Sequence, residues 1–327
     1  MKNSEIQKQL SRIDPSYLEL NANPYATYFD HPRLRITIFA GSPATIPKLL
    51  WKKEVIIVRD SWYPENVTEY VKDFLQKADY DPKRIWFLSN TDEIHTARLK
   101  HGLNSHFINI GAFIEGEEFF KPSIRKTEKM FDAAMIARFI HYRGKEVKKQ
   151  YLTSKIKRIA LLDPVYGGVD EDMKNRYTQK KNCAYFNKRR LSPGSVAKVL
   201  RQSYCGLILS DTEGVCRASS EYLLCGIPVV STKSTGGRDI WYNSYNSIIV
   251  DQNEESVWEA VKEFMKNPRD PWKIRNDYLQ QAEEFRIRFC DDVLGPILKN
   301  HRILLDPHRV LKEHTFVWWG KALEHWQ

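Results

Sequence analysis

The sequence has few cysteines and no long run of apolar residues. Five cysteines in 327 residues are an odd number, and they are widely spaced with no Cys-x-x-Cys pair. They are Cys183, Cys205, Cys216, Cys225 and Cys290. A disulfide framework and a zinc cage are therefore not expected, whereas buried reduced thiols are. No stretch approaches the roughly 18 consecutive apolar residues that a membrane-spanning helix requires.

The N-terminus lacks the apolar block of a signal peptide, so a cytoplasmic protein is the expectation. The chain carries 51 Lys and Arg against 41 Asp and Glu, a formal net charge of +10. This balance favours an anionic partner, such as a nucleic acid, a lipid headgroup or a phosphorylated substrate. A surface for single-stranded nucleic acid would interleave basic and aromatic side chains on one face. The basic residues here are dispersed, so no nucleic-acid partner is expected.

The first part of the chain alternates between strands and helices. Residues up to about Pro32 are polar and interrupted by prolines, so an irregular conformation is expected there. The apolar and β-branched run at 54–58 is typical of a strand buried on both faces. The expected strands lie at 35–40, 54–58, 84–88 and 106–110, and the expected helices at 65–78 and 92–100. This alternation predicts βαβ units and a parallel sheet.

The same alternation restarts after a polar stretch at 121–128. Strands are expected at 131–137, 158–162, 183–186, 206–210, 227–231 and 247–250, with an amphipathic helix at 254–266. The predicted fold class is α/β, with two Rossmann-like domains at 1–125 and 126–303. Ligands of such sheets bind beyond the carboxyl ends of the strands or between domains. Residues 304–327 are rich in tryptophan (Trp318, Trp319, Trp326) and are expected to form a helical tail that packs back on the N-terminal domain.

The most informative segment is 207–231. A buried strand ends near Ser210, a loop carries Glu213 into a helix that contains Glu221, and Gly226-Ile227-Pro228 ends that helix. Eight residues advance about two helical turns, so the two carboxylates are expected on one side of the helix. Carboxylates placed in this way can accept hydrogen bonds from hydroxyls at the two ends of one elongated polar ligand.

The motif Glu-x7-Glu, followed by a helix that ends in Cys-Gly-Ile-Pro-Val-Val-Ser-Thr, resembles the donor-site signature of retaining GT-B glycosyltransferases of family 4. The resemblance implies two Rossmann-like domains that face each other across a cleft. It also implies that Glu213 contacts the donor sugar during catalysis and that Glu221 binds the ribose hydroxyls. Backbone amides at the helix N-terminus, where unpaired N–H groups favour polar oxygens, would assist. They belong to Gly214, Val215 and Cys216.

A second block, at 135–145, resembles the Gly-Arg-x4-Lys-Gly element of the same family. The resemblance implies that Arg138 and Arg143 hold the diphosphate of the nucleotide, with Lys145 as a neighbouring candidate. Paired cations suit this role because negative charge develops on a diphosphate leaving group. The segment from Ser192 resembles the loop and helix beside the nucleoside base. Residues 234–240 resemble the Gly-Gly loop of the family.

Two features of the family's N-terminal domain are missing from this chain. The glycine-rich loop after the first strand has no counterpart, and Gly41-Ser42-Pro43 is the nearest segment. The first-domain histidine near a strand end is also absent, and Arg59 or Asp60 occupies its place. Either residue is a candidate for contact with donor or acceptor. For Asp60, a role as the cap of the following helix is an equal alternative.

The predicted function is that of a hexosyltransferase-type glycosyltransferase. It would move a sugar from a nucleoside-diphosphate sugar to a carbohydrate, lipid-linked or small-molecule acceptor, with retention of configuration. No metal and no cofactor beyond this co-substrate are expected. The main alternative is a catalytically decayed module that binds sugar nucleotide or glycan as a partner protein, and donor binding without transfer would favour it. A peripheral enzyme at a membrane surface is a variant of the first reading, for which clustered basic and tryptophan residues would be the sign.

Overall fold

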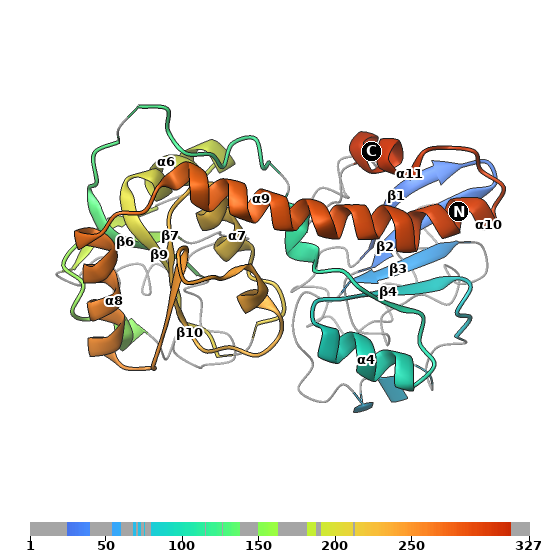
Figure 1. Ribbon diagram of the computed structural model, residues 1–327, viewed down its shortest axis with the longest axis horizontal. Helices are drawn as coiled ribbons and strands as arrows, with labels where there is room; N and C mark the ends of the chain where they lie inside the picture. The colour runs from blue at the N-terminus through green and yellow to red at the C-terminus, as the bar shows by residue number, and fades with distance from the viewer. Residues whose placement is uncertain are drawn as a thin grey trace. The chain divides into compact units, whose positions relative to one another are not determined.

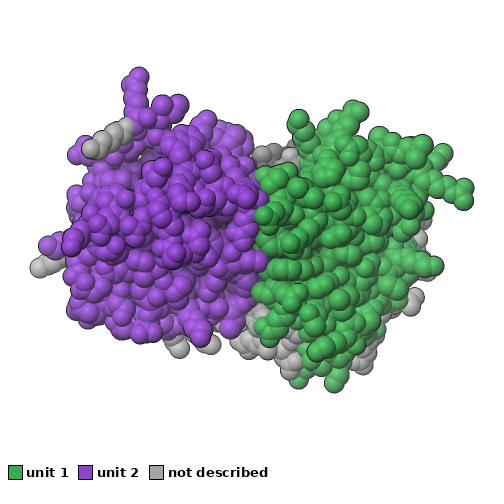
Figure 2. Space-filling model, in the orientation of Figure 1, with its two compact units in different colours: residues 1–115, 282–327 green, residues 116–281 purple. Residues whose placement is uncertain are grey.

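The computed structural model describes residues 25–39, 54–59, 68, 69, 71, 72, 75, 80–114, 116–125, 127–137, 150–162, 182–187, 191–211 and 213–314. These residues belong to two compact units, shown in green and purple in Figure 2. The first unit is Met1–Glu115 with Ala282–Gln327, and the second is Gly116–Gln281. No helix in the described part of the chain is long and apolar enough to span a bilayer.

The first unit contains a five-stranded sheet in which the strands follow one another in chain order, β1 to β5. Strands β2 to β5 pair in parallel, and β1 pairs antiparallel to β2 at the edge. The strands are β1 (Tyr25–His31), β2 (Leu34–Phe39), β3 (Val55–Arg59), β4 (Ile85–Ser89) and β5 (Ser105–Phe107). The helical segments are α4 (Asp92–Lys100), η3 (Ile110–Ala112), η6 (Phe289–Leu294), α10 (Gly295–Asn300) and α11 (Pro307–Glu313).

Strand β1 corrects the prediction that the chain is irregular up to Pro32. Its Tyr28 and Phe29 side chains are buried, with exposed fractions of 4% and 5%. Aromatic side chains favour strands because they pack well on a pleated, half-buried surface. The strand predicted at 106–110 also differs, because β5 ends at Phe107. The chain turns there into η3, whose first amides are capped by Asn109, with Gly111 N donating to Asn109 Oδ1 at 2.9 Å.

The second unit contains a six-stranded parallel sheet in the order β11-β10-β9-β6-β7-β8. The strands are β6 (Phe131–Ile136), β7 (Ile159–Leu162), β8 (Cys183–Phe186), β9 (Ser203–Ile208), β10 (Val229–Thr232) and β11 (Ser247–Val250). The helical segments are η4 (Gln150–Thr153), α6 (Pro193–Arg201), α7 (Arg217–Leu224), η5 (Arg238–Trp241), α8 (Glu254–Lys266) and the first part of α9 (Pro271–Arg288), whose residues from Ala282 on belong to the first unit. Every strand predicted in this half is present, although β9 begins three residues before the predicted start at 206.

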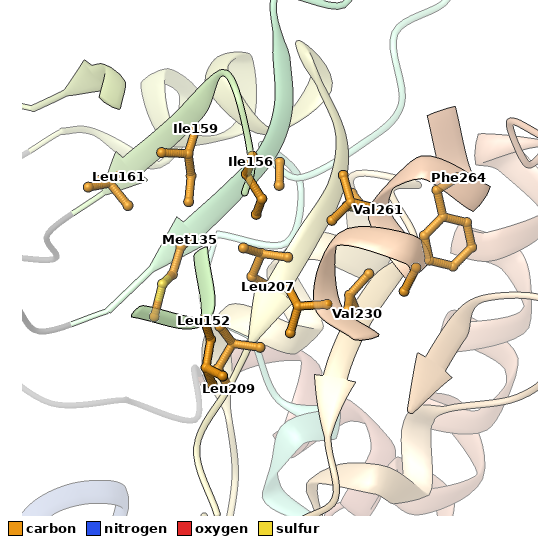
Figure 3. Packing of buried hydrophobic residues seen from close by; sticks show 14 of the residues in the cluster. Met135, Leu152, Ile156, Ile159, Leu161, Leu207, Leu209, Val230, Val261 and Phe264 are labelled. Carbon is orange, nitrogen blue, oxygen red and sulfur yellow. The ribbon is translucent and has the colours of Figure 1, made fainter. Parts of the chain in front are cut away.

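Helices cover both faces of the second sheet (Figure 1). On one face, alternate residues of the strands, such as Met135, Leu207 and Val230, pack with Val261 and Phe264 of α8 in one buried cluster (Figure 3). Because successive side chains of a strand point to opposite faces, the residues between them face away from α8. This layered packing is the α/β architecture that the sequence predicts.

The compact units divide the chain at positions other than the predicted domain boundaries of 125/126 and 303/304. The first break lies at 115/116, and residues 282–303 belong to the first unit. Aromatic packing accounts for the second difference. Phe285 lies edge-on to Phe107 at a centroid distance of 5.5 Å, and Phe289 lies edge-on to Tyr28 and Phe113 at 6.1 and 5.4 Å.

The predicted C-terminal tail begins within the first unit. Helix α11 lies there, and the ring of His314 is 5.5 Å from that of Phe29 and 6.0 Å from that of Tyr28. The tail therefore contacts β1 through its described residues. Trp318, Trp319 and Trp326 lie outside the described residues. The five cysteines are free, and all are buried except Cys183, which is half-buried.

Candidate functional site

The second sheet has a point at which its strand order reverses. The chain runs from the central strand β6 outward through β7 and β8, then returns to β9 on the other side of β6 and continues through β10 and β11. Open parallel sheets bind their ligands beyond the carboxyl ends of the strands at such a switch point. The segment after β6 leads to Arg138 and Arg143, and the loop after β9 carries Glu213. The two predicted halves of the donor site therefore begin at neighbouring strand ends.

Glu213 lies in the loop that follows β9, with its carboxylate held by two donors. Ser210 Oγ donates to Glu213 Oε2 at 2.5 Å, and Arg238 Nη1 donates to the same oxygen at 3.4 Å. The Glu213 side chain remains 32% exposed. Its backbone N donates to Thr235 O at 3.0 Å, while Thr235 N donates to Asp211 O at 3.1 Å. The loops after β9 and β10 are thus joined, and Glu213 presents a fixed, partly exposed acceptor.

Arg238 is the buried centre of this arrangement, since its side chain has no exposure (0%). It donates to Ser210 Oγ at 2.6 Å, to the backbone oxygens of Ser210 and Thr232 at 3.2 and 2.7 Å, and to Asp239 Oδ1 at 3.1 Å. Gly237, which precedes it, has a φ of 99°, a left-handed value that favours glycine. The predicted Gly-Gly loop therefore shapes the backbone that directs Arg238 inward. No role was predicted for Arg238, because its partner Ser210 lies 28 positions away in the sequence.

Glu221 lies on α7 and is almost buried, with an exposed fraction of 7%. Arg217, one helical turn earlier, donates from Nε to Glu221 Oε1 at 2.8 Å. Burial raises the pKa of Glu221, and Arg217 opposes this increase. Because α7 begins only at Arg217, Glu213 lies in the loop before the helix and not within it. Contrary to the prediction, the two carboxylates therefore do not share one side of a helix, although both follow the same strand.

The predicted amide donors precede the first turn of α7. Gly214, Val215 and Cys216 are all buried. Cys216 is the N-cap residue, and its side chain makes no capping hydrogen bond, unlike the serine, threonine or aspartate that usually occupies this position. Burial, followed by the nearby Glu213, raises the pKa of the Cys216 thiol well above its usual range. The thiol of Cys216 is therefore neutral, and its backbone marks the N-terminus of α7 at the site.

Tyr222 connects α7 to the carboxyl end of β6. Its hydroxyl accepts a hydrogen bond from Ile136 N at 2.7 Å, and its ring is fully buried. The ring lies over Gly206 of β9, where an added Cβ would meet the Tyr222 ring at 2.2 Å. Tyr222 thus ties the Glu221 helix to the strand end that leads to Arg138. No role was predicted for Tyr222, because this contact joins residues that are 86 positions apart.

The remaining predicted site residues are distributed as follows. Ser192 is exposed at the N-cap of α6, where its hydroxyl accepts from Ser195 N at 3.3 Å. Arg59 is the last residue of β3 in the first unit and is buried. The others lie outside the described residues, and their roles stay predictions. They are Asp60, Arg138, Arg143 and Lys145.

The chain is similar to solved glycosyltransferase structures. TarM has a TM-score of 0.55 at 15% identity, covering 80% of this chain and 54% of TarM, and a variant of S. aureus TarM is known with fondaparinux, α-GlcNAc-glycerol and UDP. The pneumococcal O-GlcNAc transferase GtfA, in complex with UDP and GlcNAc, has a TM-score of 0.52 at 16% identity, covering 82% and 55%. HepE from Anabaena, in complex with UDP, has a TM-score of 0.50 at 14% identity, covering 76% and 71%. The chain spans about half the length of TarM and GtfA.

These similarities confirm the predicted GT-B fold class, with two parallel-sheet units and a helical C-terminal region. No curated protein matches the sequence significantly. A profile of the glycosyl transferases group 1 matches residues 117–285, which is more than half of the 327 residues. The matched range includes the whole sheet that carries Glu213 and Glu221. The chain therefore belongs to the glycosyl transferases group 1 family.

Proposed function

We propose that the protein is a glycosyltransferase that moves a sugar from a nucleoside-diphosphate sugar to a carbohydrate or lipid-linked acceptor. The observation that carries this proposal is the pair of glutamates after β9, at the switch point of the sheet that the family profile matches. Glu213 is partly exposed and oriented by Ser210 and Arg238. Glu221 is fixed on α7 by Arg217. Both can accept hydrogen bonds from hydroxyl groups of a bound donor.

The donor would lie along the carboxyl ends of β6, β9 and β10. Glu213 would accept hydrogen bonds from sugar hydroxyls, and Glu221 from the ribose, assisted by amides of Gly214, Val215 and Cys216. Arg138 and Arg143, with Lys145, would stabilise the negative charge that develops on the departing diphosphate. Ser192 would lie beside the base. Uridine diphosphate is the first nucleotide to test, because TarM, GtfA and HepE are named with UDP.

The proposed sugar transfer needs no metal ion, because side-chain cations would neutralise the diphosphate. The described residues contain no group of three or more His, Cys, Asp or Glu side chains placed to hold a metal. Retention of configuration at the sugar is part of the proposal and follows from the family resemblance. Arg59 and Asp60 would lie on the acceptor side. We also propose that the protein is cytoplasmic and that it contacts a membrane surface when its acceptor is lipid-linked.

A calorimetric and thermal-shift screen against nucleoside diphosphates and their sugars tests the proposal. Micromolar binding of one sugar nucleotide, weakened at least tenfold in Arg138→Ala, is the expected result, since one charge-assisted hydrogen bond contributes about 1.5–3 kcal/mol. Hydrolysis or transfer, followed by NMR of the anomeric product, then reports activity and stereochemistry. A folded protein that binds none of these ligands would contradict the proposal. Binding without transfer or hydrolysis would favour the decayed module.

A further inference from the structure

Arg238 makes a set of hydrogen bonds that a surface arginine does not make. Its guanidinium is fully buried and reaches a hydroxyl, two backbone carbonyls and the carboxylates of Asp239 and Glu213. The two carbonyls belong to Ser210, two residues beyond β9, and to Thr232, the last residue of β10. A planar guanidinium with five N–H donors can satisfy acceptors on both sides at once, which a lysine ammonium cannot do.

The hydroxyl of Ser210 lies between Arg238 and Glu213. It accepts from Arg238 Nη1 at 2.6 Å and is 2.5 Å from Glu213 Oε2. A serine hydroxyl has one proton, and Arg238 can only donate. The Ser210 proton is therefore directed to Glu213, and the carboxylate is held at one oxygen by two donors. A partly exposed carboxylate that is fixed on one side is oriented to accept from a ligand on the other.

We propose that Arg238, acting through Ser210, is the positioning residue that holds the Glu213 carboxylate in the orientation needed for the donor sugar. This inference rests on the proposed function, because it concerns how Glu213 meets the sugar. Arg238 itself cannot touch the donor in this arrangement, since its side chain is not exposed. Its effect is therefore expected on the sugar part of the donor and not on the nucleotide part.

Arg238 also donates to the backbone carbonyls of Ser210 and Thr232, so its replacement can disturb the fold. Ser210→Ala separates the two effects, because it removes the hydroxyl between Arg238 and Glu213 and leaves the Arg238 bonds to both carbonyls possible. Arg238→Lys keeps the charge but removes the planar fork. A matched control is Arg158→Lys, which changes an arginine–carboxylate pair (Arg158 Nη2 to Asp132 Oδ1, 2.9 Å) beside the amino ends of β6 and β7 in the same sheet.

The experiment is a double-mutant cycle on the full chain with Ser210→Ala, Arg238→Lys and Glu213→Gln. The measured quantities are kcat and KM for the preferred sugar nucleotide and the Kd of the free nucleoside diphosphate. Ser210→Ala and Arg238→Lys should each lower kcat/KM about tenfold or more and change the diphosphate Kd less than about twofold. On the Glu213→Gln background, both substitutions should add little, since coupled residues are non-additive. Arg158→Lys should leave all three values within about twofold of wild type.

The inference is overturned if Ser210→Ala leaves kcat/KM unchanged, or if either substitution lowers it equally with and without Glu213. It is also overturned if diphosphate affinity falls in parallel with kcat/KM, which indicates general damage to the sheet edge. A wild-type protein that turns over no sugar nucleotide would refute the proposed function together with this inference. Turnover by the wild type with additive effects in the cycle would refute this inference alone.

Discussion

Replacement of Gly206 by alanine tests the packing on which the site is built. An added Cβ would lie 2.2 Å from Tyr222 Cδ2, and 2.4 and 2.5 Å from two further ring carbons. Carbon atoms in contact prefer separations of about 3.5–4.0 Å, so ring and strand would have to separate by more than about 1 Å. Gly206 lies within β9, paired with Val229 of β10 and Ala134 of β6. The strand therefore cannot move without breaking the sheet.

The Tyr222 ring is equally confined, because it is fully buried and its hydroxyl accepts from Ile136 N. Overpacking of a core costs about 1–3 kcal/mol, and the loss of one buried hydrogen bond costs about 1–3 kcal/mol. We expect Gly206→Ala to lower the free energy of unfolding by about 3 kcal/mol in urea titrations followed by circular dichroism. The double variant with Tyr222→Ala should lose much less than the sum of the two single effects, since the added methyl then has room.

Gly194→Ala is the matched control. The nearest atom to its added Cβ is Phe119 Cδ1 at 3.8 Å, an ordinary contact. Alanine favours a helix over glycine by up to about 1 kcal/mol, so this variant should equal or exceed the stability of the wild type. A Gly206→Ala protein within about 0.5 kcal/mol of wild type would refute the packing argument.

Three further outcomes are expected. Arg217→Met should lower the stability by about 1–2 kcal/mol at pH 7.5 and by less at pH 4, because the pKa of Glu221 is already raised by burial and rises further without its partner. An equal loss at both pH values in urea titrations would contradict this. His106, whose pKa burial lowers to about 4, should stay neutral at pH 5.5 in NMR titrations, and a midpoint near 6.5 would contradict its burial. As the pH falls, His106 is protonated near pH 6.5 in the unfolded state but only near pH 4 in the folded state. The free energy of unfolding should therefore fall below about pH 6.5, on the order of 2–3 kcal/mol by pH 4, and His106→Gln should reduce this loss. Tyr222→Phe should cost about 1–3 kcal/mol, since Ile136 N loses its acceptor, and an unchanged midpoint would refute the link from α7 to β6.

The sequence predicted most of the second sheet because its strands have a local signature. Runs such as 247–250 are short and mainly β-branched, and helix α8 has a clear apolar stripe whose members Val257 and Val261 are buried. The edge strand β1 was missed, because its pairing with β2 is a contact between segments and its residues are interspersed with polar ones. The prediction that Glu213 and Glu221 share one side of a helix was wrong, because the extended dihedral angles of Cys216 delay the start of α7 to Arg217.

The roles of Arg238 and Tyr222 could not be predicted from spacing. Arg238 meets Ser210 28 positions away, and Tyr222 meets Ile136 86 positions away. Both contacts arise only when the strand order brings β6, β9 and β10 side by side. The division of α9 between the units is non-local in the same way, because a helical stripe does not tell which sheet its aromatic residues contact. The placement of Glu213 in a loop and of Glu221 in the helix after β9 was predictable, because the loop, helix and glycine that surround them are consecutive in the sequence.

The proposed donor site is tested most directly by locating the residues that a bound sugar nucleotide protects. Hydrogen–deuterium exchange of the full chain, with and without saturating UDP-sugar, reports protection of individual peptides by mass spectrometry. We expect protection of peptides covering 207–217 and 232–241, which include Glu213 and Arg238, together with 135–145. We expect no change at the opposite edge of the same sheet around 157–159. Nucleotide binding that leaves 207–217 unprotected would contradict the claim that these strand ends form the donor site.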